Sequence, residues 1–105
     1  MKKIKTKIKN SILIVDAIFG IGLNKKISGI YKETINLIND SKVPVVSLDI
    51  PSGLSADSGD VFRVCVRAFQ TITFGFRKKG FTKQESAKLT GKITVVDISL
   101  PQLLK

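Results

Sequence analysis

Short apolar runs separated by a helical segment are the feature that most constrains the fold of this chain. Residues 11–15 read SILIV and residues 43–50 read VPVVSLDI, and β-branched residues are frequent in both. Nearly continuous apolar runs of this length are typical of strands buried on both faces, as in parallel sheets. Between them, apolar residues recur at helical spacing up to residues 39–41: Ile27, Ile30, Tyr31, Ile35, Leu37 and Ile38. A strand, a helix and a second strand in this order predict a right-handed parallel crossover and therefore an α/β layered fold.

Two further strands and a weaker helix complete the predicted elements. Residues 69–74 read FQTITF and residues 92–98 read KITVVDI, so we expect a mainly parallel sheet of about four strands. Residues 82–89 are the weaker helical candidate. Buried parallel strands need helices on both sides, and only one segment is strongly amphipathic. We therefore expect one face of the sheet to stay partly bare, as a partner surface or an aggregation liability.

Charge and residue content exclude several classes of protein. The 105 residues carry a net charge of +10, but five of the 18 basic residues lie within the first ten positions: Lys2, Lys3, Lys5, Lys7 and Lys9. No aromatic residue is interleaved with them, so we interpret residues 1–10 as a solvated, frayed or disordered segment and expect no nucleic-acid partner. No apolar run is long enough to span a bilayer and no signal-like stretch follows the lysines, so we expect a soluble, cytoplasmic protein. One cysteine and no histidine exclude an internal disulfide, a zinc site and an imidazole base.

Carboxylates end the first two predicted strands. Asp16 follows the first apolar run and Asp49 lies near the end of the second, and a glycine-containing loop follows each of them. Ligands of open α/β sheets bind outside the carboxyl ends of the strands, so the two acids are expected at one rim of the sheet. A single strand-end aspartate more often caps a turn, but two of them with glycine loops favour a binding site.

The groups at this rim indicate what it would bind. The Asp16 carboxylate and the Ser52 hydroxyl are hard oxygen ligands, suited to an alkali or alkaline-earth cation. Residues 20–24 contain two glycines, where backbone N–H groups can approach an anion, and they lead towards a helix N-terminus that attracts phosphate. Their Gly-x-Gly matches neither the dinucleotide fingerprint nor the phosphate loop. Ser52 is not predicted to be a nucleophile, because the chain has no histidine to take its proton.

Four ordered segments resemble a known family. VDAIFGIGL at 15–23, VVSLDIPSGLSADSG at 45–59, AFQTITFG at 68–75 and GKITVVDISLP at 91–101 are similar to the YjeF N-terminal domain family, the NAD(P)H-hydrate epimerases. The resemblance implies a Rossmann-like three-layer α/β fold. It also implies an isomerase of cofactor repair, which interconverts the R and S epimers of hydrated NADH or NADPH so that a partner dehydratase can restore the reduced cofactor.

The resemblance also implies a set of site residues. The family's potassium ligands fall on Asp16 and Ser52. Its substrate contacts fall on Asp49 and on a loop made of Gly20, Ile21, Gly22, Leu23, Asn24, Lys25 and Lys26. Inverting a carbinol centre needs proton transfer, and Asp49 is the predicted catalytic carboxylate. Lys78 matches a family lysine that follows the third strand, and an ordinary surface lysine is at least as good an interpretation of it.

Residues 11–105 match only the C-terminal half of the family's domain. The other half contains an Asn-Asn-Gly-Gly-Asp segment that contributes to the ion and substrate sites, and this sequence has no such segment. We therefore expect a truncated or split epimerase that is inactive alone, unless a complementing polypeptide or a homo-oligomer completes the site. A non-catalytic nucleotide-binding or protein-interaction module is the alternative, and a basic nucleic-acid binder is the weakest hypothesis.

Overall fold

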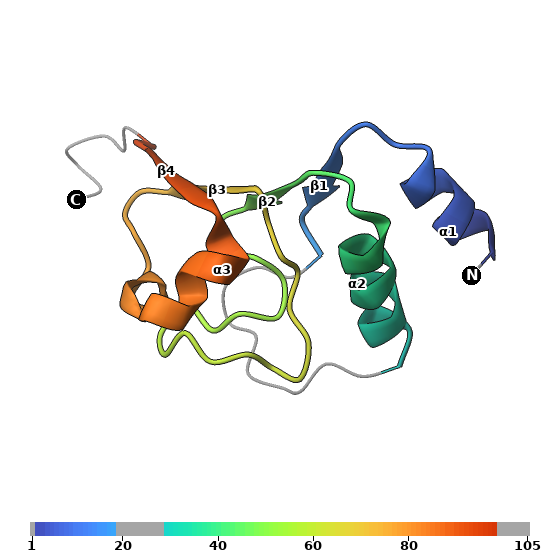
Figure 1. The fold of residues 1–105 in the computed structure, drawn as a ribbon. Helices are drawn as coiled ribbons and strands as arrows, with labels where there is room; N and C mark the ends of the chain where they lie inside the picture. The colour runs from blue at the N-terminus through green and yellow to red at the C-terminus, as the bar shows by residue number, and fades with distance from the viewer. Residues whose placement is uncertain (1, 19–28, 99–105) are drawn as a thin grey trace.

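The structure is a computed structural model that describes residues 2–18 and 29–98 and arranges them around one sheet (Figure 1). The strands are β1 (Ile14–Asp16), β2 (Val45–Leu48), β3 (Gln70–Phe74) and β4 (Lys92–Val96). The helices are α1 (Lys2–Lys9), α2 (Gly29–Ser41) and α3 (Ala87–Thr90), with two 3₁₀ turns, η1 (Lys79–Thr82) and η2 (Gln84–Ser86).

The four strands are all parallel and follow one another in the order β1-β2-β3-β4. Helix α2 lies between β1 and β2 in the chain, while η1, η2 and α3 lie between β3 and β4. The predicted α/β fold with a parallel sheet of about four strands is therefore confirmed, and it corresponds to a partial Rossmann-like arrangement. Because the strands are parallel, they all end at one side of the sheet, which we call the carboxyl edge. The residues that follow Asp16, Leu48 and Phe74 meet there.

The strands are shorter than the apolar runs that predict them. Strand β2 ends at Leu48, because Asp49 takes a positive φ of 69° that turns the chain out of the extended conformation. The long connection from β2 to β3 contains no helix and is held by an isolated bridge between Leu54 and Val61. The weak helical candidate at 82–89 forms the short elements η2 and α3.

Helices α2 and α3 lie on the same side of the sheet (Figure 1). Ile35 and Ile38 of α2 pack with Val45 and Val66 in one core cluster. A second cluster, made of Ile50, Leu54, Cys65 and Phe81, lies among the loops that follow the strands. The strand residues that face these clusters are almost fully buried, and most are small or polar: Asp16, Val45, Ser47, Thr71 and Thr73. This side of the sheet is the covered face.

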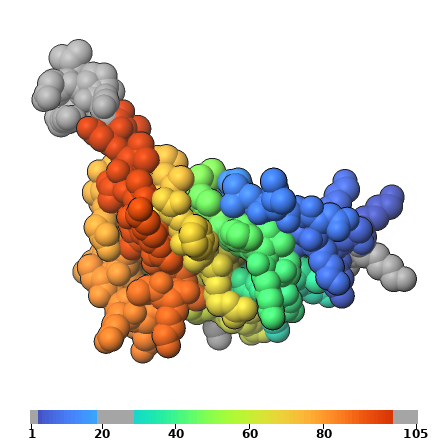
Figure 2. All heavy atoms as spheres, turned by 45° about the horizontal axis from the view of Figure 1, so that its top comes forward, coloured from blue at the N-terminus to red at the C-terminus, as the bar shows by residue number. Residues whose placement is uncertain are grey.

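The opposite face of the sheet carries an exposed, largely apolar surface. Three apolar cross-strand pairs lie on it: Val15 with Val46, Leu48 with Ile72, and Phe74 with Val96. Its polar strand residues are Gln70, Lys92 and Thr94, and the Gln70 amide donates a hydrogen bond of 2.8 Å to the Thr94 hydroxyl. Val15 is 57% exposed, Phe74 38% and Val96 39%. Within the described part of the chain no helix lies over this surface, and Figure 2 is turned to bring this side of the molecule forward. The sequence predicts this bare face, because only one strongly amphipathic helix is available to cover the sheet.

The lysine-rich start differs from its expectation, because residues 2–9 form helix α1 where we expected a solvated, frayed or disordered segment. Ile8 packs against the core cluster of α2, and the Ser11 hydroxyl donates a hydrogen bond of 2.7 Å to the Lys7 carbonyl. The lysines of α1 whose side chains are described are exposed. No helix in the described residues is both long and apolar enough to cross a membrane.

Candidate functional site at the carboxyl edge

Asp16 ends β1 and is the centre of a buried polar cluster. Its Oδ2 accepts hydrogen bonds from the Ser47 hydroxyl (2.7 Å) and the Ser52 backbone N–H (2.8 Å), and its Oδ1 accepts one from the Ser52 hydroxyl (2.5 Å). All three residues are at most 1% exposed. A buried carboxylate needs such partners, since an uncompensated charge would be costly. The cluster therefore ties β1, β2 and the turn after β2 together.

The turn that carries Ser52 depends on a glycine. Gly53 has a φ of 103°, and a Cβ atom added to it would lie 2.0 Å from the Val64 carbonyl oxygen. Only glycine tolerates both this backbone conformation and this close approach. The Ser52 carbonyl in turn accepts a hydrogen bond from the Val66 N–H (2.9 Å). Ser52 is thus held from both directions beside Asp16.

Asp49 follows β2 and is held by the end of the next strand. Its Oδ1 accepts hydrogen bonds from the Thr73 hydroxyl (3.1 Å) and the Phe74 backbone N–H (3.2 Å) and forms an ion pair with Lys78 Nζ at 3.1 Å. The Asp49 side chain is 17% exposed. Unlike Asp16, this carboxylate keeps some access to solvent. It is the better placed of the two for contact with a ligand.

Lys78 is not the ordinary surface lysine that the sequence also allows. Its side chain is 5% exposed, and its Nζ donates a hydrogen bond of 3.1 Å to the Phe74 carbonyl and lies 4.5 Å from the centroid of the Phe76 ring. That interpretation is wrong, because the ammonium is buried against a carboxylate, a carbonyl and an aromatic face. Its position after the third strand is the one sequence signal that pointed to it.

The structure brings some predicted site residues together and leaves others undescribed. Asp16 and Ser52 are in contact, as expected, while Asp49 is held by β3 and Lys78. The predicted substrate loop, residues 20–26, lies outside the described residues. Sequence reasoning missed Ser47, although its register opposite Asp16 in neighbouring strands places a second hydroxyl beside that carboxylate.

Cys65 is buried beside this region and is not a candidate nucleophile. Burial, and secondarily the negative charge of Asp16, raises the pKa of its thiol to about 12. A thiol with that pKa stays protonated near neutral pH and is a weak nucleophile. Cys65 therefore packs as a small apolar side chain in the second core cluster.

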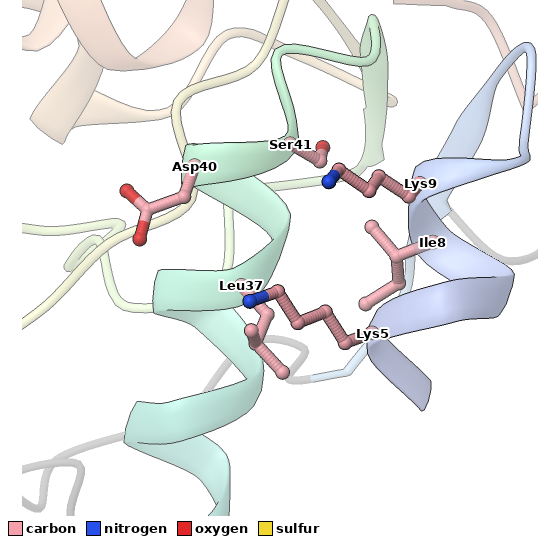
Figure 3. A pocket seen from close by; sticks show the side chains of 6 residues that line it. All are labelled: Lys5, Ile8, Lys9, Leu37, Asp40 and Ser41. Atoms are coloured by element: carbon pink, nitrogen blue, oxygen red, sulfur yellow. The ribbon is translucent and has the colours of Figure 1, made fainter. Parts of the chain in front are cut away.

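A small hollow elsewhere does not compete as a binding site. It lies between α1 and α2, has a volume of about 110 Å³, and is lined by residues that do not belong to the carboxyl edge (Figure 3): Lys5, Ile8, Lys9, Leu37, Asp40 and Ser41. Pockets for drug-sized or larger ligands typically measure ~300–1,000 Å³. The hollow is too small for a nucleotide.

A parallel sheet whose carboxyl edge gathers two carboxylates and polar side chains defines an α/β protein of the Rossmann-like class. Comparison with known families identifies it further, because residues 1–80 match the family model described as "YjeF-related protein N-terminus". The chain belongs to this family.

Named relatives agree with this assignment. The chain is 42% identical over 90 residues to a NAD(P)H-hydrate epimerase of Limosilactobacillus reuteri. The aligned residues make up 86% of this chain and 42% of that protein. It is 43% identical over 88 residues to a NAD(P)H-hydrate epimerase of Weissella koreensis, covering 84% and 40% of the two chains. It is 44% identical over 92 residues to a bifunctional NAD(P)H-hydrate repair enzyme of Moorella thermoacetica, covering 88% and 17%. The chain thus spans about two fifths of the length of the epimerases it matches.

Proposed function

We propose that this chain provides the carboxyl-edge part of the active site of an NAD(P)H-hydrate epimerase, which interconverts the R and S epimers of hydrated NADH and NADPH. The observation that carries the proposal is the identity of about 40% with curated epimerases over most of the chain, together with the family match over residues 1–80, which include Asp16 and Asp49. The partly exposed carboxylate at the end of β2 supports it.

Asp49 is the proposed catalytic carboxylate. Epimerisation removes and restores a bond at a carbinol carbon next to a dihydropyridine nitrogen, so a group that accepts or returns a proton at the substrate is needed. Asp49 Oδ1 is held by three donors, and the side chain is 17% exposed. A carboxylate fixed in this way at the rim of the sheet suits the role. The loop at 20–26, with two glycines and two lysines, is the proposed site for the substrate's phosphates.

A potassium ion is the proposed cofactor, held by Asp16 and Ser52. The donor set fits in its chemistry, because carboxylate and hydroxyl oxygens lie side by side in a buried position and Ser47 adds a third oxygen. Two or three protein oxygens do not fill the shell of a hard cation, so further ligands would have to come from elsewhere. Bound there, the ion would supply positive charge beside the site. Among the described residues no group of three or more His, Cys, Asp or Glu side chains could hold a metal.

The bare face supports a proposal about how the site is completed. Parallel sheets are covered on both faces, and here Val15, Phe74 and Val96 are more than one third exposed. We propose that this face packs against a polypeptide equivalent to the part of the epimerases that this chain does not span, and that activity requires it. A second copy of the chain is the competing occupant.

The proposed function is tested by following the two epimers of hydrated NADPH by chromatography. The substrate is incubated with the chain, with the unmatched part of the Limosilactobacillus reuteri epimerase, and with both together. We expect interconversion only in the mixture. No interconversion in the mixture, although the two polypeptides form a complex, would contradict the proposed function. Interconversion by the chain alone would contradict the requirement for a complementing polypeptide.

A further inference from the structure

Lys78 is a buried cation whose contacts are all at the carboxyl edge. Its side chain is 5% exposed and its Nζ lies 3.1 Å from Asp49 Oδ1. Burying a lysine ammonium costs free energy unless a charged or strongly polar partner compensates it. A lysine needed only for solubility would have stayed exposed, as the neighbouring Lys79 does. The cost of burying the Lys78 ammonium is therefore compensated by its ion pair with Asp49, which indicates that this contact has a role.

The Nζ atom is anchored independently of Asp49. It donates to the Phe74 carbonyl at 3.1 Å and lies 4.5 Å from the centroid of the Phe76 ring. Both groups belong to the end of β3 and the residues just after it. The contacts with Phe74 and Phe76 thus fix the position of the ammonium, and the fixed ammonium in turn positions the Asp49 carboxylate.

The two oxygens of Asp49 are used unequally. Oδ1 receives the Thr73 hydroxyl, the Phe74 N–H and Lys78 Nζ. Within the described residues no donor reaches Oδ2. A carboxylate has about four acceptor positions, two on each oxygen, so Oδ2 keeps its capacity to accept a hydrogen bond or a proton.

The backbone of Asp49 is also held in an uncommon conformation. Its φ of 69° lies in the left-handed region, which few residues other than glycine adopt. Such a conformation persists when the surrounding contacts determine it, and it is frequent at functional sites. The Asp49 N–H is also bound, to the Ile72 carbonyl at 2.6 Å, so backbone and side chain are both fixed to β3.

From these contacts we infer that Lys78 is a positioning residue: it holds Oδ1 of Asp49 against the end of β3 and so reserves Oδ2 for a hydroxyl group of the ligand. The inference rests on the proposed function for the identity of that ligand, a hydrated nicotinamide nucleotide. Lys78 itself does not contact the substrate in this arrangement.

Four forms of the chain test the inference: wild type, Lys78→Met, Lys78→Arg and, as a matched control, Lys79→Met at the adjacent exposed lysine. Calorimetry measures the affinity for hydrated NADPH in the presence of the complementing polypeptide. We expect Lys78→Met to weaken binding by about 10- to 100-fold, because a displaced Asp49 would lose the charge-assisted hydrogen bond between its Oδ2 and the ligand hydroxyl. Lys78→Arg should recover most of the affinity and Lys79→Met should retain it. Wild-type affinity in Lys78→Met would overturn the inference.

A second readout needs no ligand and separates this inference from the proposed function. In the ¹³C spectrum of the free chain, the side-chain carboxyl carbon of Asp49 should move in Lys78→Met, return towards its wild-type position in Lys78→Arg, and stay in place in Lys79→Met. Should the wild-type chain fail to bind hydrated NADPH, the proposed function fails, while this spectrum still decides whether Lys78 holds Asp49. An unmoved Asp49 carboxyl carbon in Lys78→Met would overturn the positioning role. If Lys78→Met does not fold, Lys78→Gln replaces it, because glutamine removes the charge but keeps a polar end, and the same outcome would overturn the role.

Discussion

Asp16 and Asp49 end neighbouring strands, but different partners hold them. Asp16 is fully buried and accepts its hydrogen bonds from Ser47 and Ser52, which makes it the link between β1, β2 and the turn after β2. Asp49 is partly exposed and is paired with a buried lysine. The first acid therefore contributes to the architecture of the edge and is the proposed ion ligand, whereas the second is the proposed substrate contact.

Asp49→Asn tests the role of the second acid. Asparagine has nearly the same shape and tolerates a positive φ, so the chain should still fold, with a lower free energy of unfolding because the buried Lys78 ammonium loses its charged partner. An amide cannot accept the proton, and we expect epimerisation in the complemented assay to fall by at least about 100-fold. Far-UV circular dichroism checks the fold, and Asp57→Asn at an exposed acid serves as the control. Retained activity in Asp49→Asn would remove Asp49 from the mechanism.

Gly53→Ala tests the turn that presents Ser52 to Asp16. The new Cβ would meet the Val64 carbonyl oxygen at 2.0 Å in a backbone conformation with φ of 103°. We expect a loss of roughly 3 kcal/mol of unfolding free energy, measured by urea denaturation. Gly29→Ala is the matched control, because Gly29 has a φ of 62° but no atom within 4 Å of the added Cβ. The control should lose only about 1 kcal/mol, and equal losses in the two variants would contradict the described turn.

The thiol of Cys65 reports on the burial of the second core cluster. Burial raises its pKa from 9.0 to about 12, so the folded state favours the protonated thiol. The resulting stabilisation is fully present below about pH 9 and is lost as the pH rises towards 12. We expect iodoacetamide at pH 8 to alkylate the native chain far more slowly than the urea-unfolded chain, as followed by mass spectrometry. Equal rates would show that Cys65 is exposed.

At the scale of elements, the sheet has one covered and one bare face. Each strand alternates between them: Val45 faces the core at 2% exposure, and Val46 lies on the bare face beside Val15. The apolar runs predict both faces to be buried, and the helices of the described residues supply cover for one only. The sequence of the strands thus suits burial on both faces, but the described helices cover only one.

Val15→Lys tests whether the bare face is a partner surface. Val15 is 57% exposed, so lysine should change the unfolding free energy of the chain alone by less than about 0.5 kcal/mol. The charge would be buried when a partner covers the face, so we expect the complementing polypeptide to bind at least about tenfold more weakly, measured by calorimetry. Val45→Lys, on the covered face, should unfold the chain. Unchanged complementation in Val15→Lys would place the partner elsewhere.

Elements were easier to predict than contacts. The β-branched runs predicted all four strands because local apolar pattern and parallel pairing agree, and Asp16 and Ser52 were expected together because both follow strands of one sheet. Helix α1 was missed because its lysine-rich sequence has little apolar content beyond Ile4 and Ile8. The burial of Lys78 was not predictable, since it depends on Asp49, Phe74 and Phe76 meeting in space, which no local pattern encodes.

At the scale of the whole molecule, polar chemistry and apolar exposure lie on different surfaces. The two acids, Ser52 and Lys78 gather at the carboxyl edge, while the bare face carries the apolar cross-strand pairs. The proposed ligand site and the proposed partner surface therefore occupy different parts of the molecule and would not compete. Figures 1 and 2 show the covered and the bare side of the same sheet.

The most direct test of this account is to map hydrated NADPH onto the ¹⁵N-labelled chain in complex with the complementing polypeptide. The account predicts that the largest changes in amide chemical shift occur at the carboxyl edge, at Ser52, Phe74 and Lys78. Residues around the hollow between α1 and α2, such as Ile8 and Leu37, should change little. The largest changes at that hollow, or on the bare face, would contradict the assignment of the ligand site to the carboxyl edge.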